Sequence, residues 1–211
     1  MLNYVEYGKE NKYDDDIFFQ KYSQMSRSQQ GLAGAGEWET LRKLLPDFKD
    51  KRVLDLGCGY GWHCIYAMEH GASSVVGVDI SHKMLEVAKE KTHFPQVEYK
   101  CCAIEDVEFP EESFDVILSS LAFHYVADYE ICIKKIYRIL KSGGKLIFTV
   151  EHPVFTAYGT QDWYYNEKGE ILHFPVDNYY YEGKRTAMFL EEKVTKYHRT
   201  LTTYLNTLLS N

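Results

Sequence analysis

The chain has 211 residues, of which 45% are hydrophobic, and its formal net charge is −7. This length suits one globular domain that can bury a substantial core. The negative charge argues against nucleic acid and anionic membrane surfaces as partners, because both require a basic face. The five cysteines fit neither a disulfide framework nor a metal-ligand pattern, and the sequence has no signal peptide and no apolar stretch of membrane-spanning length. We therefore expect a cytoplasmic protein that binds no metal ion.

The N-terminal part, residues 1–50, is expected to form cap helices before the first strand. Residues 1–30 are polar and contain the acidic run Asp14-Asp15-Asp16, which we interpret as a solvated surface rather than a metal site. Residues 37–45 have the spacing of a helix, and Pro46 is expected to stop it.

A Gly-rich turn follows the first predicted strand, residues 53–56. Gly57, Gly59 and Gly61 stand at alternate positions, and a helical pattern begins at Trp62. A buried strand, a tight turn and a helix start are predicted here. Glycine lets the backbone approach a ligand closely, and the N–H groups at a helix start lack partners within the helix. The segment is therefore a candidate binding loop.

Strands and helices alternate from this point to residue 150. We expect further strands over 74–78, 97–100, 114–118 and 145–150, and helices over 62–70, 81–91 and 129–140. Alternation of this kind is typical of α/β proteins with right-handed crossovers. The prediction is a doubly wound, Rossmann-like, mostly parallel sheet with helices on both faces, built from a core of residues 51–150.

The composition changes after Val150. Residues 151–196 contain Trp163 and six tyrosines, and a turn-like segment at 166–169 predicts a hairpin over 163–174. We interpret residues 151–198 as an aromatic lid inserted after strand five, and residues 199–211 as a terminal helix. The lid is expected either to close over a pocket or to form an interface, so the protein is a monomer or a homodimer through this segment.

Asp79 ends the second predicted strand, about 20 residues beyond the turn, where a carboxylate can accept both hydroxyls of an adenosine ribose. Two cofactor classes use this layout. Nicotinamide enzymes need a third glycine five positions after the first, and Trp62 stands there, which disfavours a pyrophosphate. An adenosine without phosphate, attached to a small zwitterion, suits the turn better.

Five segments in order carry a resemblance to a known family. They are Val53-Leu-Asp-Leu-Gly-Cys-Gly-Tyr-Gly61, Val76-Gly-Val-Asp-Ile-Ser81 with Met84, Ile104-Glu-Asp-Val-Glu-Phe109 before Ser113-Phe-Asp-Val116, Ser119-Ser-Leu-Ala-Phe-His124 and Leu140-Lys-Ser-Gly-Gly-Lys-Leu146. In this respect the chain resembles class I S-adenosylmethionine-dependent methyltransferases of the type 11 family, which are similar to the methyltransferases of ubiquinone biosynthesis. The resemblance covers about residues 50–152.

The resemblance implies S-adenosylmethionine as cofactor, S-adenosylhomocysteine as product, and a role for each matching residue. The loop residues Gly57, Cys58 and Gly59 would face the methionine end, and Asp79 would bind the ribose. Adenine would contact five residues, Ile80, Met84, Ala103, Ile104 and Glu105. Ser119 would lie beside the sulfonium, and an N-terminal segment with Tyr22, Met25 and Arg27 would fold over the cofactor.

The sequence departs from this family in two places. Many relatives have Asp where this chain has Ala103, which leaves the adenine amino group to a backbone carbonyl or to Glu105. The usual last two strands have no counterpart after Asn211. Either the sequence is a piece of a longer protein, or residues 171–196 supply edge strands, because an uncovered edge at strand five would invite pairing with another chain.

Three functions compete at this point. The first is a methyltransferase acting on a small and rather apolar or aromatic acceptor, with His124 as candidate base, since imidazole titrates near neutral pH. His124 is equally compatible with a pocket wall. Asp/Asn-Pro-Pro-Tyr, typical of nucleic-acid amino methylation, is absent, and Ser119-Ser120-Leu121-Ala122 stands in its place. The second function is a non-catalytic module that binds S-adenosylmethionine or a partner, and the third is a nicotinamide-dependent oxidoreductase.

Overall fold

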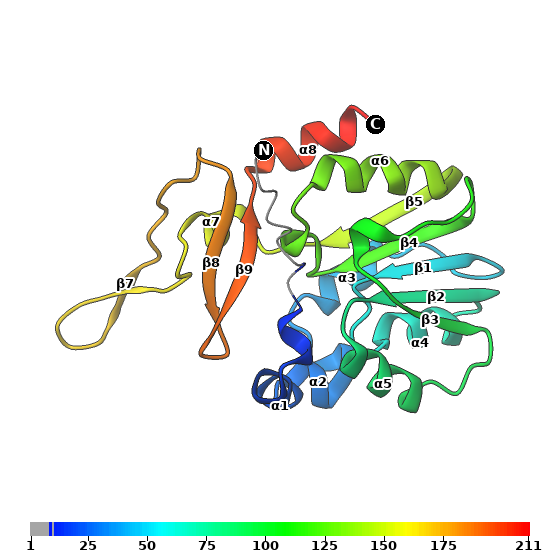
Figure 1. The fold of residues 1–211 in the computed structure, drawn as a ribbon, viewed down its shortest axis with the longest axis horizontal. Coiled ribbons are helices and arrows are strands. Elements are labelled where there is room, and N and C mark those ends of the chain that lie inside the picture. The colour runs from blue at the N-terminus through cyan, green and yellow to red at the C-terminus, as the bar shows by residue number, and fades with distance from the viewer. Residues whose placement is uncertain (1–8, 10) are drawn as a thin grey trace, which may run out of the picture.

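The protein is built on one parallel five-stranded sheet with the strand order β3-β2-β1-β4-β5 (Figure 1). The computed structural model describes residue 9 and residues 11–211. The sheet strands are β1 (Arg52–Leu56), β2 (Ser74–Asp79), β3 (Val97–Cys101), β4 (Phe114–Ser120) and β5 (Leu140–Thr149). The order reverses between β1 and β4, and in such sheets ligands bind at the carboxyl ends of the strands beside this switch point.

Helices cover both faces of the sheet, as the alternation predicted (Figure 1). The helices α4 (Trp62–Glu69) and α5 (His82–Lys91) lie on one face, and α6 (Tyr129–Ile139) and α8 (Leu201–Leu209) lie on the other. Side chains of successive residues in β1 point to opposite faces of the sheet. Val53 belongs to the buried cluster with Cys64 and Leu85, whereas Leu54 belongs to the cluster with Ile133 and Ile136. Each face of the sheet therefore has its own buried apolar core.

The turn between β1 and α4 is the tightest place in the core. Gly61 has φ +74°, and a Cβ there would stand 2.2 Å from the Tyr99 hydroxyl oxygen. Thr92 hydrogen-bonds that hydroxyl at 2.8 Å, so Tyr99 is not free to move away. A side chain at position 61 would therefore force the turn or Tyr99 to shift.

We expect Gly61→Ala to lower the free energy of unfolding by about 2 to 3 kcal/mol, since left-handed strain and overpacking add. Gly59→Ala is the matched control, because Gly59 has φ +52° but no atom within 4 Å of the added Cβ. Strain alone predicts a loss of about 1 kcal/mol there. Urea unfolding measures both values, and equal losses in the two variants would contradict the packing argument.

The α6–β5 connection differs from the prediction. The expected helix over 129–140 and strand over 145–150 are in fact α6 ending at Ile139 and β5 beginning at Leu140, without an intervening loop. Gly143 and Gly144 lie inside β5, opposite an irregularity in the pairing with β4. The helix can end so abruptly because the backbone N–H groups of Glu112 and Ser113 donate to its last carbonyls, those of Arg138 and Ile139.

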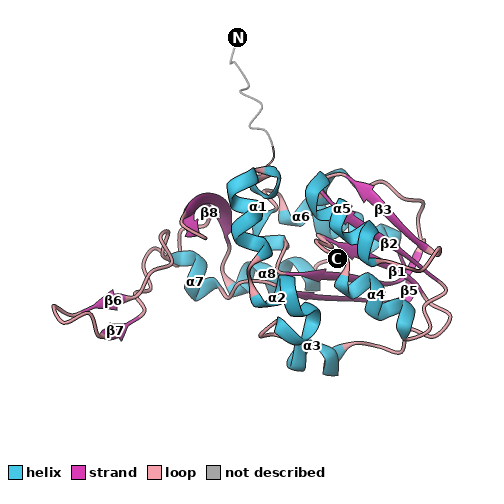
Figure 2. Ribbon diagram, turned by 90° about the horizontal axis from the view of Figure 1, so that it is seen from below, coloured by secondary structure: helices cyan, strands magenta, loops and turns pink. Residues whose placement is uncertain are grey.

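The segment after β5 forms hairpins that stay separate from the main sheet. After the short helix α7 (Pro153–Ala157) come β6 (Tyr164–Tyr165) and β7 (Ile171–His173), then β8 (Gly183–Phe189) and β9 (Glu192–His198). The β6–β7 hairpin lies within the predicted range 163–174 and projects away from the sheet (Figures 1 and 2). The expectation that residues 171–196 supply edge strands is wrong, because β8 and β9 pair only with each other.

The N-terminal helices are η1 (Lys12–Asp14), α1 (Asp16–Ser23), α2 (Ser26–Gln30), η2 (Gly31–Gly34) and α3 (Trp38–Leu44). The short helices η3 (Ile104–Asp106) and η4 (Phe123–Tyr125) follow β3 and β4. Asp14 contradicts the solvated-surface interpretation of the acidic run. Its carboxylate accepts hydrogen bonds from the Ser81 hydroxyl at 2.6 Å and from the backbone N–H groups of His82 and Lys83. Asp14 thereby attaches the N-terminal segment to the start of α5.

The helices are short compared with the thickness of a bilayer. Within the described residues, none is both long enough and apolar enough to cross one.

Candidate functional site

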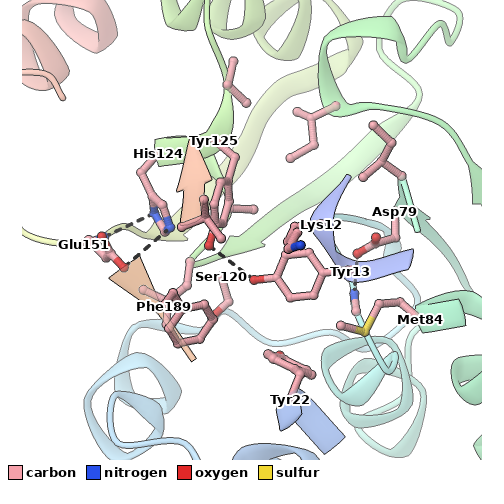
Figure 3. A pocket seen from close by; sticks show the side chains of 18 of the residues that line it. Lys12, Tyr13, Tyr22, Asp79, Met84, Ser120, His124, Tyr125, Glu151 and Phe189 are labelled. Carbon is pink, nitrogen blue, oxygen red and sulfur yellow. Dashed lines mark hydrogen bonds and ion pairs between the residues drawn. The ribbon is translucent and has the colours of Figure 1, made fainter. Parts of the chain in front are cut away.

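A cavity of about 660 Å³ lies at the carboxyl ends of β1, β2 and β4 (Figure 3). Its walls come from the loops after these strands, from the N-terminal helices and from the β8–β9 hairpin. The cavity therefore has a floor made by the sheet and two covers made by segments far apart in the sequence. This position is the one that the strand order predicts for a ligand.

The Gly-rich turn meets Asp79 at the floor. The Gly59 N–H donates to one carboxylate oxygen of Asp79 at 2.8 Å, and the Ser81 N–H donates to the other at 2.9 Å. Each oxygen keeps a second lone pair for a ligand. Burial raises the pKa of Asp79 above its ordinary value, although both N–H groups act in the opposite direction.

Gly57 fixes how closely the turn approaches its neighbours. It has φ +77°, and a Cβ there would stand 2.5 Å from the Ala122 Cβ. The main chain at Gly57 is thus in direct contact with the loop after β4, and both lie in the cavity wall. Any side chain at position 57 would separate these two walls.

An apolar end of the cavity lies beside Asp79. Met84 is buried, and its N–H donates to the Ser81 hydroxyl at 3.1 Å, which places the side chain one turn into α5. Ile80, Ala103 and Ile104 line the same region, together with Glu105. A thioether and aliphatic side chains are suited to packing against a planar apolar ring.

The opposite wall contains an ion pair from the N-terminal helices. Arg27 is paired with Glu37, whose carboxylate also accepts from the Ser120 hydroxyl at 3.2 Å. Burial opposes ionisation of Glu37, but hydrogen bonds from its own backbone N–H, from Arg27 and from Ser120 lower its pKa. A guanidinium and a carboxylate therefore stand side by side at the cavity, both charged at neutral pH.

His124 lies at the end of the cavity away from Met84, in η4 (Figure 3). Its Nδ1 accepts from the Glu151 backbone N–H at 3.5 Å, and its Nε2 lies 3.9 Å from the Glu151 carboxylate. Burial lowers the pKa of His124 to about 4. Both ring nitrogens thus face Glu151, and the imidazole is neutral at neutral pH.

Glu151 joins the sheet to the β8–β9 hairpin. Its carboxylate accepts from Lys196 Nζ at 2.5 Å and from the Gln161 side chain at 2.8 Å. The Lys196 side chain is only 3% exposed, so the pair is shielded from water. Arg199, also buried, donates to the carbonyls of Phe123, Val126 and Ala127. These contacts hold the hairpin against the loop after β4.

Most of the residues singled out in the sequence meet in this cavity. The twelve that line it are Tyr22, Met25, Arg27, Gly57, Gly59, Asp79, Ile80, Met84, Ala103, Ile104, Glu105 and His124. Cys58 instead lines a neighbouring space of about 70 Å³ that shares Gly57 and Gly59 with the cavity. Ser119 is buried, and its hydroxyl donates to the Leu56 carbonyl at 2.9 Å, so its neighbour Ser120 faces the cavity in its place.

Several residues that line the cavity were not identified as candidates from the sequence. Among them are Tyr13, Glu37, Tyr125, Glu151, Phe189 and Tyr197. Glu151 could have been found, because it follows β5 and therefore lies at the same sheet edge as Asp79. No motif or spacing in the sequence identifies Tyr13 as a site residue. Phe189 and Tyr197 could not be placed without knowing that their hairpin folds back over the sheet.

Comparison with known proteins agrees with this geometry. A family model described as a methyltransferase domain matches residues 54–148, which include the Gly-rich turn and Asp79. The ubiquinone biosynthesis O-methyltransferase of Coxiella burnetii is 37% identical over 112 residues, which are 52% of this chain and 47% of that enzyme. The chain thus spans about half the length of that relative.

Two solved structures match far more of the chain. A Listeria monocytogenes protein, described provisionally as an S-adenosylmethionine-dependent methyltransferase, is 58% identical with a TM-score of 0.80, over 83% of this chain and 82% of that one. An S-adenosylmethionine-dependent methyltransferase from Mesorhizobium loti is 40% identical with a TM-score of 0.79, over 85% and 82%. The nicotinamide alternative is therefore wrong. The chain belongs to the class I S-adenosylmethionine-dependent methyltransferases, in the type 11 family.

Proposed function

We propose that the protein transfers a methyl group from S-adenosylmethionine to a small-molecule acceptor held between η4 and the β8–β9 hairpin. The observation that supports this most strongly is the meeting of the Gly-rich turn and Asp79 in one cavity. The net charge of −7 argues against nucleic acid as acceptor. The similarity to an enzyme of ubiquinone biosynthesis also favours a small molecule.

The residues present fit the cofactor. Gly57 and Gly59 leave the main chain bare, and a Cβ on Gly59 would meet nothing within 4 Å, so this space is open to a ligand. The free lone pairs of Asp79 would accept from the ribose hydroxyls. Adenine would pack against Met84, Ile80 and Ile104, and Glu105 would lie at its polar edge, since the Ala103 side chain cannot accept a hydrogen bond there.

The ion pair of Arg27 and Glu37 suits the methionine zwitterion. A guanidinium recognises a carboxylate through paired hydrogen bonds, and a carboxylate accepts from an ammonium. Arg27 would therefore hold the carboxylate of the cofactor, and Glu37 with Ser120 would hold its amino group. Cys58 and Ser119 would pack behind the residues that contact the methionine end of the cofactor, and would not contact it themselves.

The cofactor supplies a methyl group already activated by a sulfonium. The protein mainly has to align the acceptor for in-line displacement and keep water out. The two covers of the cavity perform both tasks: η1 and α1 close one side, attached through Asp14, and the hairpin closes the other, attached through Glu151 and Lys196. His124 would position Glu151 and form part of the acceptor wall.

Replacing Arg27 by glutamine is expected to weaken binding of S-adenosylhomocysteine by about tenfold, because one charge-assisted contact to the carboxylate is lost. Arg42→Gln is the matched control, since Arg42 is exposed and pairs with Glu39 within α3. Isothermal titration calorimetry measures both affinities. An unchanged affinity in Arg27→Gln would remove Arg27 from the cofactor site.

The function itself is tested by binding and turnover. We expect the wild-type protein to bind S-adenosylhomocysteine with micromolar affinity or better, and to release it from S-adenosylmethionine when a suitable acceptor is supplied. An acceptor panel, with mass spectrometry of the products, identifies the methylated compound. A protein that binds the cofactor but never yields product would instead be a non-catalytic module.

A further inference from the structure

The acceptor end of the cavity has walls of aromatic rings. Tyr13 and Tyr22 meet edge to face, with centroids 5.2 Å apart and planes at 85°. Tyr13 and Tyr125 meet in the same way at 6.2 Å and 88°, and their hydroxyls lie 3.3 Å apart. We call Tyr13, Tyr22 and Tyr125 the aromatic corner. All three line the cavity, and Tyr13 stands between Asp79 and Tyr125 (Figure 3).

The charges around the cavity favour cations over anions. In the part of the chain that the structure describes, every cation in the lining is already in an ion pair: Lys9 with Asp106, Lys12 with Asp15 and Glu192, and Arg27 with Glu37. Lys196, just behind the wall, is paired with Glu151. Among the described lining residues, five are acidic (Glu37, Asp79, Glu105, Asp128 and Glu151) against these three cations, so acidic side chains are in surplus.

The Asp79 carboxylate, in contrast, lies near the aromatic corner. Burial raises the pKa values of Tyr13 and Tyr22, and the Asp79 carboxylate acts in the same direction on both, although the Arg27 guanidinium opposes the rise at Tyr22. Both phenols are therefore neutral, and the Asp79 carboxylate lies close enough to act on them. A neutral aromatic face attracts a cation, and more strongly when water is excluded.

His124 is not an effective general base. Each ring nitrogen of His124 faces Glu151, and its pKa is lowered to about 4 by burial. The Glu151 carboxylate is occupied by Lys196 and Gln161. A phenol, alcohol or thiol acceptor would develop negative charge on losing its proton, and the surplus of acidic side chains in the described lining disfavours that charge.

An acceptor whose methylated product is a cation meets these conditions. We infer that the acceptor is a small alkylamine, and that the aromatic corner binds the ammonium group of the methylated product. The inference rests on the proposed methyl transfer. The amine first loses its proton to water. Its nitrogen lone pair then forms a bond to the methyl carbon while the carbon–sulfur bond breaks, and the electron pair of that bond stays on sulfur. The positive charge moves from sulfur to nitrogen, and the cavity contains a cation throughout.

A pair of probes of equal shape separates charge from size. We would titrate the protein, loaded with S-adenosylhomocysteine, with choline and with dimethylbutanol, in which carbon replaces the charged nitrogen. The expected result is that choline binds at least about tenfold tighter, as cation–π contact in a shielded site predicts. Dimethylbutyrate, an anion of similar shape, should bind most weakly.

Substitutions of Tyr125 test whether the aromatic corner is responsible for the preference for choline. Tyr125→Leu should reduce the choline preference to about threefold or less, whereas Tyr125→Phe, which keeps the ring, should retain most of it. Tyr165→Leu is the control, because Tyr165 lies in the exposed β6–β7 hairpin. The affinity for S-adenosylhomocysteine, measured first, reports whether each variant is folded.

The outcomes distinguish the two proposals. Equal binding of choline and dimethylbutanol, or tightest binding of the anion, would overturn the amine inference and leave the methyltransferase function intact. A wild-type protein that fails to bind S-adenosylhomocysteine would overturn the proposed function, and the inference with it.

Discussion

Replacement of Asp79 by alanine is expected to weaken binding of S-adenosylhomocysteine by about a thousandfold. Two charge-assisted hydrogen bonds to the ribose would be lost, each contributing about 1.5 to 3 kcal/mol. The same change also frees the Gly59 and Ser81 N–H groups, which now donate to Asp79 at 2.8 and 2.9 Å. The turn would lose the contact that holds it beside β2, so the site would lose both a ligand contact and its shape.

Isothermal titration calorimetry checks this prediction, with Asp106→Ala as control. Asp106 also lies near the end of β3, but it is exposed and pairs with Lys9. The wild-type affinity should also fall as the pH is lowered through the pKa of Asp79, which burial raises. Asp79→Ala should lack this pH dependence. If the variant binds within threefold of wild type, the ribose is held elsewhere.

Asp55 is expected to make the fold less stable as the pH rises. It is 1% exposed on β1, its Oδ1 has no hydrogen-bond partner, and the Cys64 thiol donates to Oδ2 at 3.5 Å. Burial raises the pKa of Asp55 to about 7, against about 3.9 in an unfolded chain. Between these two values the folded protein keeps a proton that the unfolded chain releases, so stability falls as the pH rises from about 4 to 7.

A pKa change of this size corresponds to at most about 4 kcal/mol. We therefore expect the stability of Asp55→Asn relative to wild type to increase by up to about 4 kcal/mol between pH 4 and pH 8, as measured by urea unfolding. Asp115→Asn serves as control. Hydrogen bonds from the Arg52 N–H and from Lys141 outweigh burial and lower the pKa of Asp115, so its effect should be constant over this range. Parallel curves for wild type and Asp55→Asn would show that Asp55 keeps its ordinary pKa.

The meeting of the Gly-rich turn with Asp79 was predictable because its signals are local. Alternate glycines after an apolar run predict a tight turn, and a carboxylate at the end of the next strand must lie at the same sheet edge. Gly57, Gly59 and Asp79 follow from these two statements alone. Ser119 was placed wrongly relative to the cavity by one residue, since side chains alternate along β4 and the sequence does not show which of two serines faces the ligand.

The rest depends on tertiary contacts that a sequence pattern does not carry. Gly143 and Gly144 resemble a helix stop, yet pairing of Leu140 with Phe114 extends β5 back to the last residue of α6. Asp14 resembles surface charge, yet it accepts hydrogen bonds at the start of α5, about 70 residues further along the chain. Polar and apolar residues alternate too weakly along β8 and β9 to show which face of the hairpin would contact the cavity.

The separate pairing of β8 with β9 has a consequence for how this enzyme can change over evolutionary time. The hairpin contributes Phe189, Val194 and Tyr197 to the cavity, but it shares no ladder with the five-stranded sheet. It is secured by side chains, chiefly Lys196 on Glu151 and Arg199 on backbone carbonyls. A descendant that keeps these anchors could therefore exchange the rest of the hairpin and acquire a new acceptor, while the machinery that holds the methyl donor stays the same.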